Sequence, residues 1–493
     1  MPYEIFLTSV PFALILLKEK IMNASTIIEQ LDKLLWGWPQ IILLLGTHLF
    51  MTFKTGFVQK DIFKAIKLSV TKDPDAPGDV SQFGALTTAL ASTVGTANII
   101  GVGTAIALGG PGAVLWIWFT GVFGIATKYA ETVIALKYRV KSQDGTMLGG
   151  AMYALERGLK LKWLGIAFAF LAALCGLGIG CSVPANAVVA TVKENLNATG
   201  TYGQALTYAI AVILCALVGV AIIGGVKSIT KVSEKLVPFM AIFYVLGCLI
   251  ILIMNADVMA QTISTIVCTA FTPRAAGGGF IGSTIASACR FGIARGLFSN
   301  ESGMGSAPLV AAAAQSRNPK RQALVSMTGT FWDTVVVCLM TGLVLVSCII
   351  KHPFIDGMSG NGSELTSLAF STIPIVGKPV LVVGLITFTF STMLGWYYYG
   401  ERCAVYLFGE KAILVYKIIW IAGIFAGSLA ELKFIWNIAD ILNGLMSIPN
   451  IVAVLLLSGV IASETKKYAG KHIDDFDDTE IPVVKNSRRG VIG

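Results

Sequence analysis

The chain has 493 residues, of which 55% are hydrophobic and 13% are charged, and its mean hydropathy is +0.76. Ordinary soluble globular proteins do not reach this composition, so the sequence predicts a polytopic membrane protein. The nine cysteines stand singly and form no metal-binding motif with the three histidines, so we expect no cofactor, metal centre or redox chemistry.

Runs of about 20 apolar residues recur along the chain and predict an all-α bundle that spans the membrane. Residues 5–17 are apolar but lack the basic flank of a signal peptide, so we interpret residues 1–35 as an N-terminal apolar or amphipathic segment. Eleven spans are predicted, at residues 36–57, 84–108, 113–136, 163–190, 205–224, 236–256, 280–313, 323–349, 378–398, 412–428 and 434–462. The final residues, 463–493, are polar and without helical periodicity, which predicts a disordered tail.

The basic residues alternate from loop to loop. If the N-terminus lies outside the cell, the loops and tail on the cytoplasmic side hold 24 Lys and Arg residues and the opposite loops hold 7. This asymmetry predicts a cell-membrane protein with an outer N-terminus and a cytoplasmic C-terminus. The net charge of +9 therefore belongs to the cytoplasmic side and does not indicate nucleic-acid binding.

Two of the predicted spans are interrupted by polar and glycine residues. One reads QFGALTTALASTVGTANIIGVGTAIALGG from Gln82, and the other contains SNESGMGS from Ser299. Irregular backbone at membrane depth is tolerated only where it is buried in protein or lines a cavity. Small residues that merely allow close helix packing remain an alternative for the first span, but not for the second, where Asn300 and Glu301 each cost about 0.5–3.5 kcal/mol in the membrane.

The interrupted spans begin two groups of five, residues 84–256 and 280–462, which the loop charges place in opposite orientation. The span at 36–57 lies outside this arrangement. Paired interruptions in inverted halves point to the substrate site of a secondary transporter, near the bilayer midplane.

At the first interruption, the helix that resumes presents free N–H groups near Thr96 and Ala97, which suit a carboxylate. The helix that ends presents carbonyl oxygens near Thr93 and Val94, and these, together with the Asn98 amide, suit a hard cation. A zwitterionic amino acid with a companion cation would use both.

At the second interruption, we expect the carbonyl groups before Gly303 and the side chains of Asn300 and Ser302 to receive the ammonium group of the substrate. In the ninth span, the adjacent hydroxyls of Ser391 and Thr392 are candidates for a second cation site, although such hydroxyls more often bond to their own helix. Four large side chains are candidates for the pocket wall: Met393, Trp396, Phe168 and Phe170.

Several charged residues fall within the spans. Glu301 is either a counter-charge in the site or the ion-pair partner of Arg295 or another arginine of that span, and the pairing is favoured. Asp333 is either a coupling-ion or proton group or a partner for those arginines. Lys128 and Glu131 lie three residues apart on one helix face, which favours a structural ion pair over a proton relay.

The sequence resembles the alanine or glycine:cation symporters in the strings QFGALTTALASTVGTANI, GGPGAVLWIWFTGVFGIATKYAE, GLFSNESGMGSAP and GWYYYGERC. The resemblance runs from about residue 30 to 460. It implies a leucine-transporter-like fold of eleven helices with a 5+5 inverted repeat. It also implies uptake of alanine or glycine with Na+, with the substrate bound at Thr93 to Asn98 and at Asn300 to Gly305.

The sequence departs from that family at three positions. Ala97 stands where the family usually has glycine, Pro184 stands two residues before Asn186 where a glutamine is usual, and Ser302 stands where alanine is usual. These changes bear on the particular amino acid and on its coupling more than on the class of protein.

A Na+-coupled importer is the function that these features favour. A proton-coupled transporter, a channel or a sensor of the same fold remains the alternative, although a channel would need a continuous polar stripe. An intramembrane enzyme is not expected, because the spans carry no constellation of nucleophile, base and acid.

Overall fold

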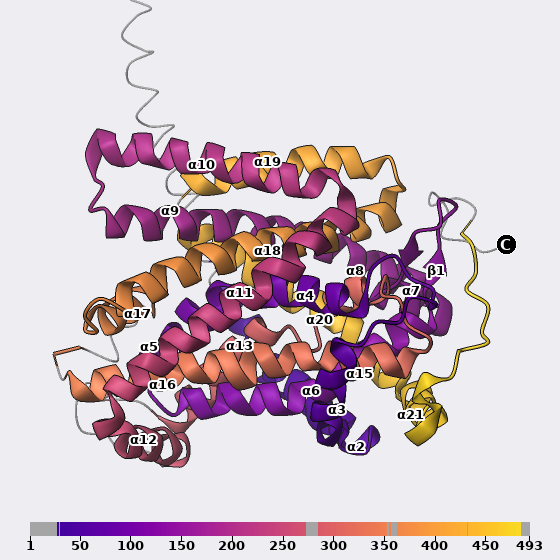
Figure 1. Ribbon diagram of the computed structural model, residues 1–493, viewed down its shortest axis with the longest axis horizontal. Helices are drawn as coiled ribbons and strands as arrows, with labels where there is room; N and C mark the ends of the chain where they lie inside the picture. Colours follow the sequence, from indigo (N-terminus) through magenta and orange to yellow (C-terminus); the bar gives the residue numbers. More distant parts are fainter. Residues whose placement is uncertain are drawn as a thin grey trace, which may run out of the picture.

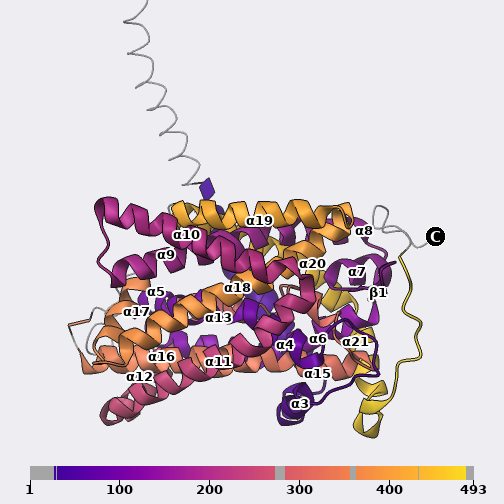
Figure 2. The ribbon, with the colours of Figure 1, turned by 45° about the horizontal axis from the view of Figure 1, so that its top comes forward.

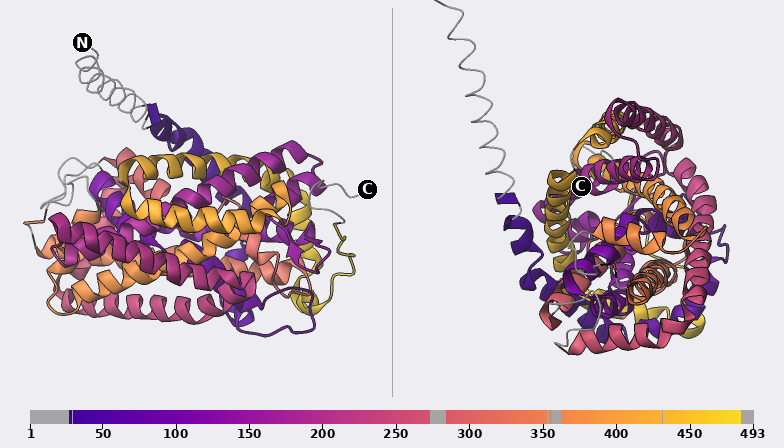
Figure 3. Two further views of the ribbon diagram at one scale, coloured as in Figure 1. Left: turned by 90° about the horizontal axis from the view of Figure 1, so that it is seen from above. Right: turned by 90° about the vertical axis from the view of Figure 1, so that its left-hand side faces the viewer.

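The computed structural model describes residues 27–28, 30–272, 284–352, 354–355, 362–430 and 432–484. Most of the predicted N-terminal segment, 1–35, and the end of the tail, 485–493, lie outside the described residues. Within them the chain is helical apart from one short antiparallel hairpin, β1 (Val140–Lys141) and β2 (Met147–Leu148). The long helices run along the longest axis of the molecule (Figure 1 and Figure 3).

The first predicted span is α2 (Trp38–Lys54), which begins with a proline in its first turn. It bends by 71° into η1 (Val58–Asp61) and α3 (Ile62–Ser69). The first group of five then comprises α4 (Gln82–Thr93), η2 (Ala97–Gly101) and α5 (Val102–Gly109), α6 (Ala113–Lys137), α8 (Lys162–Cys175), η4 (Gly176–Ser182) and α9 (Val183–Asn195), α10 (Gly200–Ile223), and α11 (Gly225–Met254).

The second group begins with α13 (Ile285–Asn300) and the four-residue helix α14 (Pro308–Ala311). It continues with α15 (Pro319–Thr330), η6 (Phe331–Cys338) and α16 (Leu339–Lys351), α18 (Gly377–Phe408), α19 (Ala412–Leu429), and α20 (Leu432–Leu456). The connections carry α7 (Ala151–Tyr153), η3 (Ala154–Gly158), η5 (Ala256–Val258), α12 (Met259–Phe271), α17 (Gly362–Ser371), α21 (Ser458–Lys467) and η7 (Gly470–Asp474).

Among the described residues, eight helices are long and apolar enough to cross a membrane, or ten if each bent pair is one span. The remaining predicted span, 280–313, is represented by α13, which has 16 residues and ends at a break. The fold is therefore the predicted all-helical membrane bundle. The helix of one predicted span, α13, is too short to cross a membrane by itself.

The interrupted helices lie inside the bundle. The helices α6 and α15 pack against each other, α13 packs on α6 and α5, and α18 packs on α4, α8 and η4. In Figure 2, α18 crosses the molecule between the layer of α10 and α19 and the elements around α13 and α6. Both breaks are consequently surrounded by helices instead of lipid.

The ends of the bundle differ in charge. Figure 1 places β1, α7 and α21 at the right-hand end and α12 and α17 at the opposite end. The right-hand end carries the Lys- and Arg-rich loops, and we call it the basic end.

The prediction of a disordered tail is wrong for the part that the structure describes. After α21 and η7, the chain runs along the basic end, where the Asp477 N–H donates to Arg317 O at 2.8 Å. Further on, the Val484 N–H donates to Lys141 O at 2.8 Å, so the tail adds to the β1 edge. The pairing is between backbone groups, which sequence periodicity does not reveal.

Candidate functional site

The first break separates α4 from η2 and bends the span by 53°. Ser81 caps the start of α4 by accepting from the Gly84 N–H, and Val94 ends it with an extended ψ of 93°. The helix resumes at Ala97, so the N–H groups of its first turn, including those of Thr96 and Ala97, have no intrahelical acceptor. The break thus presents the free backbone groups that the sequence predicts.

Asn98 holds this break in shape. Its Oδ1 accepts from the Gly95 N–H at 2.7 Å, and its Nδ2 donates to Asp333 Oδ1 at 2.7 Å. Asn98 is fully buried, so both contacts form away from solvent. The amide therefore links the break in the first half of the chain to η6 in the second half.

Asp333 is the centre of a cluster of hydrogen bonds. Besides Asn98, it accepts from Ser299 Oγ at 2.9 Å and from Thr334 Oγ1 at 2.6 Å, both at Oδ2. The alternative that Asp333 pairs with the arginines of α13 is wrong, because all of these donors are neutral. Its carboxylate joins three elements, η2, α13 and η6, at one buried point.

The hydroxyl pair on α18 adjoins the first break. Ser391 Oγ and Thr392 Oγ1 both donate to Phe388 O, at 2.8 and 2.9 Å. A Cβ atom on Gly95 would lie 2.6 Å from Thr392 Oγ1, so only glycine allows α18 to approach so closely.

The second break is braced by charged side chains. Its backbone takes positive φ angles at Glu301 (53°), Gly303 (92°) and Gly305 (78°). Glu301 is a non-glycine residue in the left-handed region, a conformation that persists only where the surroundings hold it. The Trp396 indole donates to Glu301 Oε1 at 3.0 Å, and Ser306 Oγ donates to Oε2.

The backbone groups of this break find partners on α6 and α20. Lys128 Nζ donates to the Glu301 carbonyl at 3.1 Å, and the Gly305 N–H donates to Glu131 Oε1 at 3.0 Å. Asn450 bridges the two halves of the brace, because its Nδ2 donates to Glu131 Oε1 at 2.5 Å and to Gly303 O at 2.9 Å. The favoured Lys128–Glu131 ion pair is therefore corrected: each side chain serves a different backbone group of the break.

Two further predictions are overturned. Arg295 pairs with Asp440 of α20 at 3.6 Å and not with Glu301, which lies further along the chain and faces α18. Phe170 does not border the pocket, because it is 53% exposed on α8, whereas Phe168 is fully buried. A Cβ atom on Gly305 would lie 2.9 Å from Phe168 Cε2, which places Phe168 at the second break.

Trp396 lies buried beside the second break, and Met393 is buried one turn before it. Gly180 of η4 packs against Trp396. A Cβ atom on Gly180 would lie 2.0 Å from the Trp396 Cβ atom, so the two elements touch only because residue 180 is glycine. Asn186, beside the departure at Pro184, donates to Gly427 O and Ala430 O at 3.1 and 2.6 Å. Its amide thus ties α9 to the end of α19 and lies away from the two breaks.

Three polar atoms at the breaks are buried and have no hydrogen-bond partner in the structure: Asn300 Nδ2, Glu131 Oε2 and His48 Nε2. Neither His48 nor Asn450 was predicted from the sequence. His48 lies on α2, outside the repeat, with its Nδ1 2.8 Å from Thr127 Oγ1. The signal was a single histidine within an apolar span, which by itself is too common to single out.

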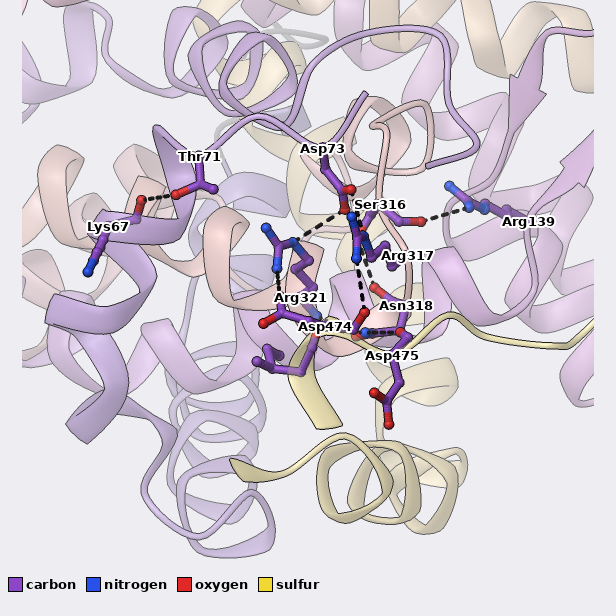
Figure 4. A network of polar contacts seen from close by, with 11 residues as sticks. Lys67, Thr71, Asp73, Arg139, Ser316, Arg317, Asn318, Arg321, Asp474 and Asp475 are labelled. Atoms are coloured by element: carbon purple, nitrogen blue, oxygen red, sulfur yellow. Dashed lines mark hydrogen bonds and ion pairs between the residues drawn. The ribbon is translucent and has the colours of Figure 1, made fainter. Parts of the chain in front are cut away.

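The basic end is closed by a network of ion pairs and carbonyl contacts (Figure 4). Asp73 Oδ1 lies 2.7 Å from Arg317 Nε, and Asp73 Oδ2 lies 3.5 Å from Arg321 Nε. Arg321 also pairs with Asp474 of the tail. Asn318 Nδ2 donates to the tail carbonyls of Ile473 and Asp475, both at 2.9 Å. The segment before α4, the segment before α15 and the tail are thereby joined.

Arg139 adds to this closure, although it was not predicted. Its guanidinium donates to four carbonyls of the two segments at 3.2–3.4 Å: those of Pro77, Ala312, Ala314 and Ser316. Burial lowers the pKa of Arg139 to about 10, which leaves it charged at neutral pH.

A bundle with two interrupted helices that meet at a buried polar cluster defines a secondary transporter of leucine-transporter-like fold. The crystal structure of MhsT in complex with L-phenylalanine shares this fold, with a TM-score of 0.57 and 16% identity, over 79% of this chain and 92% of that chain.

The model of the sodium:alanine symporter family matches residues 21–481, and the chain belongs to that family. It is 46% identical to the sodium/alanine symporter AgcS of Methanococcus maripaludis, over 91% of this chain and 98% of the relative. It is 35% identical to the probable sodium/glutamine symporter GlnT of Bacillus subtilis, over 89% of each. The protein is thus a multi-pass membrane symporter of amino acids with Na+, and not an enzyme.

Proposed function

We propose that the protein carries a small neutral amino acid, alanine or glycine, into the cell together with Na+ by alternating access. The observation that supports this most is the cluster of Asp333, Asn98 and Ser299, which joins the two breaks around one buried carboxylate. A buried carboxylate whose hydrogen-bond donors are all neutral attracts a cation, and hard oxygen ligands favour Na+ over softer ions.

We assign one cation position to this cluster. Asp333 supplies the negative charge, and the hydroxyls of Ser299 and Thr334 present lone pairs to the ion when they rotate away from the carboxylate. Asn98 then offers its amide oxygen if the Gly95 contact opens. Ion binding would in this way change the shape of the first break.

A second cation position lies between the first break and α18. Its ligands are the carbonyls near Thr93 and Val94 and the hydroxyls of Ser391 and Thr392. The closeness of Thr392 to Gly95 supports this position, because the two helices meet there without an intervening side chain.

The substrate lies between the breaks in this proposal. The N–H groups of Thr96 and Ala97 receive its carboxylate. The sequence assigned Asn300 to the ammonium group, but its Oδ1 already accepts from the Ser302 N–H at 2.9 Å, so we assign its unpartnered Nδ2 to the carboxylate instead. The ammonium group then goes to carbonyl oxygens before Gly303 and to the hydroxyl of Ser302, with Gly305 leaving room for the backbone turn.

The tight packing favours a small substrate. Thr96 and Ala97 are each 7% exposed and Ser302 is fully buried, so the site is occluded in this conformation. The Ala97 methyl, in place of the usual glycine, narrows it further, while Trp396 and Met393 limit it on the α18 side. We therefore rank alanine and glycine above a longer side chain such as that of glutamine.

The membrane potential supplies the driving force. A potential of about 100 mV contributes about 2.3 kcal/mol per charge, which corresponds to about 40-fold accumulation of substrate for one Na+. The basic end faces the cytoplasm in this proposal, so that the potential drives Na+ and amino acid inward.

Uptake by the purified protein in vesicles tests the proposal. We expect labelled alanine or glycine to accumulate when an inward Na+ gradient is imposed, and unlabelled glutamine to compete weakly. Accumulation driven equally by a proton gradient in the absence of Na+ would favour the proton-coupled alternative instead.

A matched pair of α18 variants sharpens this test. Thr392→Ala removes a proposed ligand, whereas Thr387→Ala removes a hydroxyl of the same helix that bonds to the carbonyls of Val383 and Gly384. We expect only Thr392→Ala to raise the Na+ concentration needed for half-maximal uptake, by about tenfold or more, the loss of one ligand contact to an ion being worth about 1.5–3 kcal/mol.

A further inference from the structure

A groove of about 470 Å³ opens on the outside of the bundle between α3, α4, α11 and η6. Val70, Ile242 and Trp332 form its rim, and they are 67%, 60% and 38% exposed. Its floor reaches Val94, the residue at which α4 ends at the first break. The groove therefore runs from the basic end to the depth of the proposed cation sites.

Apart from the indole of Trp332 at the rim, the lining offers no free polar side-chain group to a ligand. Its only hydroxyl side chains are Ser69 and Thr87, and both donate to carbonyls of their own helices, to Ile66 O at 2.7 Å and to Gly84 O at 3.1 Å. Because α11 spans the membrane and its Ile242 and Leu246 are exposed, the groove faces the hydrocarbon region. The chemistry that fits such a groove at such a depth is a hydrocarbon chain.

The mouth of the groove is basic. Lys67 lies on α3 between the lining residues Ile66 and Val70, and Lys235 lies three residues before Pro238 of α11, on the same helix face. Both lysines are exposed, and within the described part of the chain neither has a carboxylate at ion-pair distance. Figure 4 shows Lys67 turned away from the Asp73 cluster.

The nearby acidic residue is already engaged. Glu234 Oε1 accepts from Ser81 Oγ at 2.8 Å, at the start of α4, so it is held by the helix cap. Next to the mouth, α3 and the turn before it have the character of an interfacial segment. Phe63 of α3 is 80% exposed, and Lys60 Nζ of η1 lies 5.2 Å from the centre of the Phe57 ring. Exposed aromatic and basic side chains together suit the head-group region of a membrane that contains anionic lipids.

We propose that this groove binds an anionic phospholipid, with one acyl chain along α4 and α11 and the phosphate held by Lys67 and Lys235. The two inner walls of the groove are α4, which ends at the first break, and η6, which carries Asp333. A bound chain fills the space into which these walls would separate, and it stabilises the conformation described here. Lipid binding in this groove does not depend on the proposed function, whereas any effect of the lipid on transport does.

The test measures lipid binding without Na+ or amino acid, so that its outcome does not depend on transport. The full-length protein in detergent is titrated with phosphatidylglycerol or with phosphatidylcholine of the same acyl chains, and thermal unfolding is followed. We expect phosphatidylglycerol to raise the unfolding temperature at concentrations at least about tenfold lower than phosphatidylcholine. Equal effects of the two lipids would overturn the head-group site.

Three variants locate the binding. Lys67→Glu with Lys235→Glu should remove the preference for phosphatidylglycerol, whereas Lys411→Glu, an exposed lysine at the start of α19, should leave it unchanged. Ala241→Trp fills the groove without changing charge and should remove stabilisation by both lipids. A retained effect in Ala241→Trp, or an equal loss in Lys411→Glu, would show that the lipid does not occupy this groove.

Native mass spectrometry of the wild-type protein gives a second measurement that needs no variant. After mixing with both lipids in equal amount, we expect one phosphatidylglycerol molecule to remain bound as detergent is removed by collisional activation. Random retention of either lipid would contradict the proposal.

Discussion

The two breaks differ in the side chains that bond to their interrupted backbone. At the first break, the contacts come from the neutral amide of Asn98, and the free N–H groups of the next turn face the protein interior. At the second break, Lys128 and Glu131 bond to backbone groups, and the Glu301 carboxylate accepts from the side chains of Trp396 and Ser306. Free backbone groups are available for ligands where they are left uncovered, so the difference indicates that the first break binds cations and that the second is a braced break.

Asp333 is a further difference between the two breaks, because its buried carboxylate contacts the first break. It is the one carboxylate tied to the first break among the described residues, and it reaches that break from the opposite half of the chain. The negative charge can therefore respond to an ion at the first break, and its contact with Ser299 carries that response to α13, just before the second break.

The largest effect is expected from Asp333. Asp333→Ala removes the carboxylate that accepts from Asn98, Ser299 and Thr334, although Asn98 Nδ2 keeps its contact with the main-chain carbonyl of residue 333 at 3.2 Å. Each buried donor that loses its acceptor costs about 1–3 kcal/mol, so we expect a marked loss of stability and no Na+-dependent uptake. Asp333→Asn keeps the shape and should fold, while the Na+ concentration for half-maximal uptake rises by more than about tenfold. Unchanged Na+ dependence in Asp333→Asn would remove this carboxylate from the ion site.

The contact between Gly95 and α18 comes next. In Gly95→Ala the new methyl group meets Thr392 Oγ1, and overpacking of this kind costs about 1–3 kcal/mol. Gly95→Ala with Thr392→Ala should recover most of the unfolding temperature but not Na+-dependent uptake. Strictly additive losses of stability in the double variant would mean that the two residues do not compete for space.

At the braced break we expect a smaller effect, which changes stability and not Na+ dependence. Glu131→Gln keeps one carbonyl oxygen for Gly305 and Asn450 but loses the charge-assisted part of these bonds, about 1–2 kcal/mol of stability. Its Na+ dependence should match that of the wild type. A large shift in Na+ dependence, measured by uptake in vesicles, would contradict the division between a cation-binding first break and a braced second break.

The smallest effect is expected at the basic end, which resembles the braced break because charged side chains cover backbone groups there. Lys137 pairs with Glu464 at 2.9 Å and lies 3.7 Å from Asp477, and it is 21% exposed. Lys137→Ala should cost less than about 1 kcal/mol and should increase proteolysis of the tail. Lys411→Ala, which removes an exposed lysine that has no ion pair with the described part of the tail, is the control.

The same contacts predict a response to pH. Burial raises the pKa of Asp477, but the Thr479 hydroxyl and Lys137 outweigh it and hold the pKa below its usual value. A carboxylate with a depressed pKa stabilises the folded tail at neutral pH, and this contribution is lost as pH falls through the depressed pKa. Hydrogen exchange of residues 475–484 should therefore increase on acidification, beyond its intrinsic pH dependence, and less so in Asp477→Asn.

The sequence by itself determined the class of structure. Runs of apolar residues predict the spans, and glycine, Asn300 and Glu301 inside such runs predict the breaks, because hydrocarbon penalises polar groups and irregular backbone that are not enclosed by protein. The sequence also predicted that Thr392 lies close to the first break, because the span that carries it must pack against the interrupted helices in a bundle.

Only the tertiary structure decided which side chains meet. Phe168 and Phe170 are two residues apart, so a helix turns them to opposite faces, and only packing shows that Phe168 faces Gly305 while Phe170 faces outward. Likewise, the sequence left Asp333 and Arg295 with several partners, because contacts between distant segments depend on how helices pack. Asn98 became the partner of Asp333 when the two halves of the chain packed together, and Asp440 became the partner of Arg295 through packing within the second half.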